Sequence, residues 1–106
     1  MPKYLVMADY TSEGMQGVLA KGGTARRDAV EAMAAGLGGR LESFYFAFGE
    51  HDAFVIVDLP DNTSAAAVGM TVSGSGMAAA QTTVLLSPEE IDQAASASVK
   101  YTAPGS

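Results

Sequence analysis

Apolar residues at the start of the chain predict a strand followed by an interrupted helix. Residues 3–10 are rich in side chains that favour β-strands, on both faces of the strand. Thr11 supplies a side-chain oxygen of the kind that begins helices. The glycine pair at 22–23 then breaks the helical pattern and restarts it.

The restarted helix carries a clear apolar stripe. Four of its residues repeat at helical spacing: Val30, Met33, Ala34 and Leu37. This spacing places Arg26 and Arg27 largely toward the opposite side, and the glycines of 36–39 end the helix.

The middle of the chain predicts a β-hairpin. Residues 40–48 alternate, with Leu41 and Tyr45 on one side. The other side carries three aromatic residues, which mark it as the packed face: Phe44, Phe46 and Phe48. After a turn-rich segment, the apolar run 53–59 is typical of a central strand that is covered on both faces.

The last third predicts a helix, a strand and a helix. Residues 60–63 end the preceding strand and cap a helix with a thin stripe of small residues. A more weakly patterned strand follows over 77–86. Ser87 to Glu90 form a capping box with proline at the first helical position, which predicts a short helix through about Ser98. The tail, 100–106, is expected to be loosely held.

The order of these elements predicts an α+β fold. It is a ferredoxin-like βαββαβ sandwich with an extra C-terminal helix, built as one domain over 1–106 with all crossover helices on one face of the sheet. A domain of this size buries only about two-thirds of the surface that its unfolded chain exposes. Strands with apolar residues on both faces therefore predict self-association, at least to a dimer.

Composition excludes several classes of partner. The net charge of −6 opposes both nucleic acid and anionic membranes. The chain has no cysteine, so thiol chemistry, disulfides and the usual structural zinc sites are ruled out. No run of residues reaches the length of a membrane span, and no leader pattern precedes the first strand, so a cytoplasmic location is expected.

The segment from Gly39 through the hairpin to Asp61 closely resembles the signature of the GYD domain family, whose function is unassigned. The similarity extends to the opening strand, to 22–27 and to the capping box at 87–90. His51 stands where the family's Gly-Tyr-Asp signature has tyrosine. The resemblance implies a compact ferredoxin-like fold akin to the dimeric α+β barrel proteins, and it implies no activity.

Three residues are candidates for proton transfer. His51 is the only histidine, and histidine is the residue type best suited to carry a proton in general acid–base chemistry. Glu42 and Tyr45 lie on the first hairpin strand, where a carboxylate or phenol inside a cavity can act as acid or base. The alternatives are an exposed turn residue for His51 and cross-strand pairing for the other two.

Arg26 and Arg27 are candidates for ligand binding, together with His51. Both arginines follow a glycine-rich helix start, where backbone N–H groups also favour anions. We expect this helix start and the His51 hairpin to share the rim of a cavity, within one chain or across two. The alternative is a solvated surface whose charges form weak ion pairs.

Three functions remain open from the sequence. The first is a homo-oligomeric binding or regulatory module for a small anionic or aromatic metabolite, with no cofactor and no metal. The second is a cofactor-free monooxygenase or isomerase that uses His51, Tyr45 or Glu42. The third is a purely structural homo-oligomer. Convergence of the candidate polar residues on one concave space would favour ligand binding or catalysis, and scatter over the surface would favour a structural role.

Overall fold

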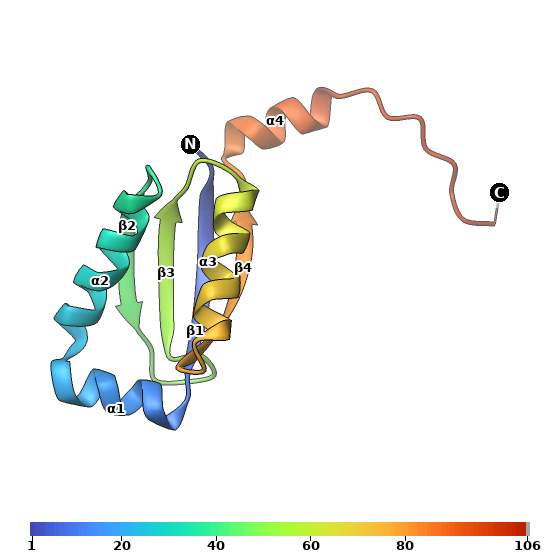
Figure 1. Ribbon diagram of the computed structural model, residues 1–106. Coiled ribbons are helices and arrows are strands. Elements are labelled where there is room, and N and C mark those ends of the chain that lie inside the picture. The colour runs from blue at the N-terminus through green and yellow to red at the C-terminus, as the bar shows by residue number, and fades with distance from the viewer. Residues whose placement is uncertain (106) are drawn as a thin grey trace.

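The computed structural model describes residues 1–105, and within them the chain forms a four-stranded antiparallel sheet and four helices (Figure 1). The strands are β1 (Lys3–Tyr10), β2 (Arg40–Phe46), β3 (Ala53–Asp58) and β4 (Ala78–Leu85). Their order across the sheet is β2-β3-β1-β4. The predicted α+β class is confirmed, and this arrangement is consistent with the ferredoxin-like sandwich.

The helices begin at the positions that the sequence predicts, and the last one ends at Ser96, two residues before its expected end. They are α1 (Ser12–Lys21), α2 (Gly23–Gly36), α3 (Asn62–Gly74) and α4 (Pro88–Ser96). The Thr11 and Asp61 side chains cap α1 and α3, and the capping box at Ser87 starts α4. Gly22 separates α1 from α2 at φ +88°, a backbone angle that favours glycine.

The main core lies between one face of the sheet and the helices α2 and α3. Tyr4 and Val57 are register partners on β1 and β3, and both are buried on this face. They pack in one cluster with Ala34 of α2, with Ala65 of α3 and with Leu59, which follows β3. Burial of these side chains is the main force that holds the two helices on the sheet.

A β-bulge in β2 changes the predicted strand faces. Leu41 pairs with Val57 and Ser43 pairs with Ile56, so two steps on β2 match one step on β3. Leu41 therefore faces the helices, like Phe44, and not the side of Tyr45 as the simple alternation predicts. The extra residue is Glu42.

The phenylalanine stripe is only partly a core. Phe44 is half-buried beneath α2, and its ring lies 5.0 Å from that of Phe46, centre to centre. Phe48 is fully exposed because β2 ends at Phe46 and the chain turns away. The prediction that Phe48 packs with the other two is wrong.

The opposite face of the sheet is not covered by any helix of the described residues (Figure 1). Its apolar side chains are partly or largely exposed: Leu5, Met7, Tyr45, Phe54 and Ile56. The strand β3 is central, as predicted, but a single chain covers only one of its faces.

The helix α4 leads away from the sandwich, and the chain after it extends further out (Figure 1). No residue of α4 is buried. Residues 97–105 contain no further helix or strand, and Ser106, the end of the predicted tail, lies outside the described residues. Among residues 1–105, no helix has both the length and the apolar character needed to cross a membrane.

Candidate ligand-binding site

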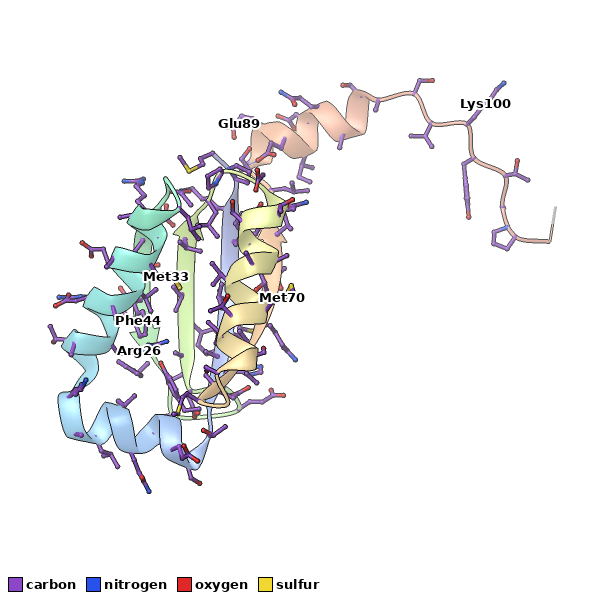
Figure 2. The ribbon with its side chains drawn as sticks, viewed as in Figure 1. Arg26, Met33, Phe44, Met70, Glu89 and Lys100 are labelled. Carbon is purple, nitrogen blue, oxygen red and sulfur yellow. The ribbon has the colours of Figure 1, made fainter. Side chains whose placement is uncertain are left out.

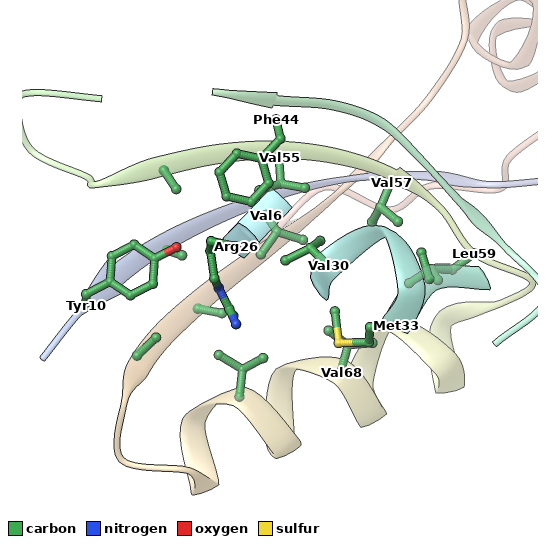
Figure 3. Close-up of a pocket in the computed structure, with 16 residues that line it drawn as sticks. Val6, Tyr10, Arg26, Val30, Met33, Phe44, Val55, Val57, Leu59 and Val68 are labelled. Carbon is green, nitrogen blue, oxygen red and sulfur yellow. The ribbon is translucent and has the colours of Figure 1, made fainter. Parts of the chain in front are cut away.

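Arg26 lies on the inner side of α2, where the apolar stripe predicted Val30 and Ala34. The three residues are spaced by four, so they form one row along the helix. The Arg26 side chain extends into the space between α2, α3 and the sheet (Figures 2 and 3). The prediction that Arg26 faces away from the apolar stripe is therefore wrong.

The Nε atom of Arg26 is buried and has no hydrogen-bond partner among the described residues. A buried donor without an acceptor costs free energy, because it has lost water and gained nothing in return. Native structures contain few such groups, and each one calls for an explanation, such as a bound ion or a functional role.

Beside Arg26 is a small apolar cavity of about 50 Å³ (Figure 3). Its wall comes from the inner faces of the sheet, α2 and α3, including Val30, Phe44, Val55 and Val68. A space of this size holds one or two water molecules or a small apolar group. Arg26 is the only charged residue in its wall among residues 1–105.

An open cleft of about 500 Å³ adjoins this cavity. It lies between α1, the first turns of α2 and the chain from the end of α3 to β4. Four residues line both spaces: Tyr10, Arg26, Val72 and Ala78. A ligand in the cleft would therefore meet Arg26 at the inner end.

The cleft also contains other features that bear on an anion. Lys21 and Glu13, at the two ends of α1, are its further charged lining residues. The helix α2 has no side-chain cap at Gly22 and no acidic residue in its first turn. Its first backbone N–H groups are therefore available to a negatively charged group.

Close backbone contacts fix the wall of the cleft. The backbone N–H of Thr11 donates to the carbonyl oxygen of Met77 at 3.0 Å. A Cβ atom on Gly14 would overlap the same carbonyl group, so only glycine lets α1 start this close to the chain before β4. A Cβ atom on Gly23 would lie 2.8 Å from the ring of Phe46.

Arg27 lies on the outer side of α2. Its Nη2 atom is 3.3 Å from a carboxylate oxygen of Asp28, and both side chains are largely exposed. Such a pair contributes little to stability. Arg27 does not line either the cavity or the cleft. The two arginines that the sequence predicts to bind one ligand together therefore lie on different sides of α2.

His51 lies toward the uncovered face of the sheet. Its Nδ1 atom is 3.1 Å from a carboxylate oxygen of Asp9, and its ring meets that of Phe54 edge to face. Asp9 and Phe54 both belong to the face away from the helices. Within one chain, Arg26 and His51 therefore lie on opposite faces and do not share a rim.

Glu42 belongs to an ionic cluster at the other end of the uncovered face. It accepts a hydrogen bond from Lys3 Nζ at 2.6 Å, and Lys3 also donates to Asp58 at 2.9 Å. Arg40 Nε donates to the second oxygen of Asp58 at 3.0 Å. The hydrogen bond from Lys3, assisted by that from Arg40, holds the pKa of Asp58 below its usual value although burial acts against it.

The three candidates for proton transfer are not brought together in one chain. Glu42 is paired with Lys3, His51 lies near Asp9, and Tyr45 is 71% exposed on β2 between them. Among residues 1–105, no group of three or more histidine or acidic side chains is placed to hold a metal ion.

The sequence reasoning missed most of the cleft. Its lining includes Gly14, Gly17 and Met77, and none of these has a motif that marks a binding residue. The signal that was present is the spacing of Arg26 from Val30 and Ala34, which puts a cation in an apolar row.

The fold and the cleft define an α+β domain with one open sheet face and, under its helices, an apolar cavity whose wall includes Arg26. The chain matches the GYD domain family over residues 4–95, and it therefore belongs to that family. Comparison with curated proteins and with solved structures gave no match.

Proposed function

We propose that this GYD domain protein is a homo-oligomeric module that binds a small anionic molecule in the cleft beside Arg26. The observation that carries the proposal is the buried Nε atom of Arg26, which has no partner among the described residues. A carboxylate can accept two N–H bonds from one guanidinium, and no acidic side chain among residues 1–105 forms an ion pair with Arg26, so an anion in the cleft would supply the missing counterion.

The surroundings of Arg26 support an anion and not a structural ion pair. On one side of Arg26, the wall of the apolar cavity contains no acidic side chain that could pair with it. On the other side, the uncapped start of α2 favours negative charge. The apolar side chains on the inner side keep water from part of the Arg26 guanidinium, and an ionic contact is stronger where water is excluded.

Self-association is the second part of the proposal, and its partner is a second copy of the chain. The uncovered sheet face has an apolar centre that includes Met7, Phe54 and Tyr45. At one end of this face is the exposed guanidinium of Arg40, and at the other is the partly exposed carboxylate of Asp9. Two copies related by a two-fold axis across the strands would pair these opposite charges and bury the apolar centre.

The enzyme alternative has weaker support, because its three candidate residues lie apart on a face that one chain leaves open. A second copy would have to bring them together. A purely structural role is the outcome that remains if no anion binds.

The test is thermal unfolding of the purified protein with millimolar monocarboxylates and inorganic phosphate. A ligand at a hundred times its dissociation constant adds about 2.7 kcal/mol to the free energy of unfolding. Arg26→Met keeps the apolar stem and removes the charge, so it should abolish the shift. Arg27→Met, one residue away on the outer side, is the matched control and should keep it.

The same variants separate a binding role from a structural one. Because Arg26→Met removes a buried donor that lacks an acceptor, the unliganded variant should be at least as stable as the wild type. No anion-induced shift in the wild type, or an equal shift in Arg26→Met, would overturn the binding proposal.

A further inference from the structure

We infer that the ligand of this cleft is an aromatic monocarboxylate, bound with its carboxylate at Arg26 and its ring along α1. The inference rests on the proposed function, since it names the chemical class for the same site. It is carried by the charge, the shape and the depth of the cleft.

The charges of the cleft select a monoanion. Its charged lining residues are Arg26, Lys21 and Glu13, so two cations face one carboxylate. A single negative charge matches this balance. A phosphate at neutral pH carries more charge and more bound water, and Glu13 in the cleft lining would repel it.

The shape of the cleft favours a flat body. Its helical walls present small residues, with Gly17 on α1 and Ala25 and Ala29 on α2. No atom lies within 4 Å of the point where a Cβ atom on Gly17 would stand, so the space above that backbone is open. A flat ring can lie directly against a surface of such small residues, because no large side chain projects from it.

Tyr10 and Met77 add a preference for an aromatic ring over an alkyl chain. Both line the cleft, and the side chain of each is partly exposed. Tyrosine pairs with aromatic rings, and the methionine thioether makes favourable contacts with ring edges.

The depth of the two spaces fixes the orientation. The inner cavity of about 50 Å³ is too small for a ring, whereas the cleft of about 500 Å³ is within the range of small-molecule sites. With the carboxylate at the boundary beside Arg26, the ring must therefore extend outward over Gly17.

The experiment is calorimetric titration of the full chain with four probes: 2-naphthoate, decanoate, acetate and inorganic phosphate. We expect 2-naphthoate to bind at least about tenfold more tightly than each of the other three, a difference of one decade in Kd. Arg26→Met should remove 2-naphthoate binding.

Gly17→Leu tests the position of the ring. The added side chain enters open space in the cleft, and leucine has a higher helix propensity than glycine, so the variant should remain folded. It should weaken 2-naphthoate binding by about tenfold or more. Ala20→Leu, on the same helix but outside the cleft lining, should leave binding unchanged. Ala29→Leu fills the cleft from α2 and provides a second, independent variant.

The outcomes separate this inference from the proposed function. If decanoate, acetate or phosphate binds as tightly as 2-naphthoate and depends on Arg26, the site is correct and the aromatic class is wrong. If 2-naphthoate binds through Arg26 but neither Gly17→Leu nor Ala29→Leu weakens it, the placement of the ring is wrong. If no probe depends on Arg26, the proposed function itself fails.

Discussion

Lys3 and Asp58 are register partners on β1 and β3, and the Lys3 ammonium donates to the Asp58 carboxylate at 2.9 Å. The carboxylate is buried, and its second oxygen accepts from Arg40. Its two oxygens therefore both have charged donors. This arrangement links β1 to its neighbour β3 through side chains. It also makes the free energy of unfolding depend on pH.

Asp58→Asn should lower the free energy of unfolding by about 2 kcal/mol at pH 7, because two charge-assisted hydrogen bonds are weakened. The pKa of Asp58 is lower in the folded protein than its ordinary value of 3.8. Its contribution is therefore fully present above that ordinary value and is lost as the pH falls through the folded pKa. Urea unfolding from pH 7 to pH 2 should show the difference between variant and wild type shrinking below about pH 4. A difference that stays constant to pH 2 would contradict this account.

Gly39→Ala should be strongly destabilising, by about 3 kcal/mol or more. A Cβ atom at this position would overlap the carbonyl oxygen of Asp58, which is backbone and cannot move without disturbing β3. The control is Gly69→Ala in α3, where the new atom meets nothing within 4 Å. That change should stabilise the protein by about 0.5–1 kcal/mol through helix propensity. Chemical denaturation of the two variants checks both signs, and equal effects would count against the close contact.

Tyr45→Lys and Phe54→Lys should each shift the proposed oligomer toward single chains. Both side chains lie on the uncovered face and are 71% and 37% exposed, so lysine at either position is tolerated in one folded chain. Leu19→Lys is the control, because Leu19 is 79% exposed on α1, away from this face. The mass from light scattering at micromolar concentration is the measurement. A wild-type mass of 10.8 kDa would remove the oligomer from the proposal.

Ser87→Ala and Asp61→Ala should have different effects although each removes a helix cap. The Asp61 carboxylate accepts from the backbone N–H of Ser64 at 2.8 Å and starts α3, which packs on the sheet. Its loss should cost about 1 kcal/mol of global stability. The helix α4 has no buried residue, so Ser87→Ala should increase hydrogen exchange in α4 and leave the unfolding midpoint unchanged. A lower midpoint for Ser87→Ala would mean that α4 is held by contacts that a single chain lacks.

Much of the fold could be predicted because its boundaries are local. Thr11, Asp61 and Ser87 cap helices through their own side chains, and Gly22 marks the break between α1 and α2. These signals lie within a few residues of the structure they determine. The α+β class and the helix after each cap followed from them.

The strand faces and the cleft depend on contacts between distant residues. The extra residue at Glu42 changes which side Leu41 faces, and nothing in a period of two predicts such an insertion. The apolar stripe that begins at Val30 predicts Arg26 on the opposite side of the helix, whereas the way α2 docks on the sheet turns Arg26 inward. The cleft itself forms only because Gly14 allows α1 to start against Met77, a contact across 63 residues of sequence.

The outward path of α4 has a hydrodynamic consequence. A compact chain of about 100 residues has a radius of gyration of roughly 13 Å, whereas that of this chain is 16.8 Å, with extents of 57 × 33 × 24 Å. The projecting helix adds drag but little mass. A single chain of this outline should diffuse and elute like a heavier globular protein, so the number of copies in solution must be read from mass and not from apparent size.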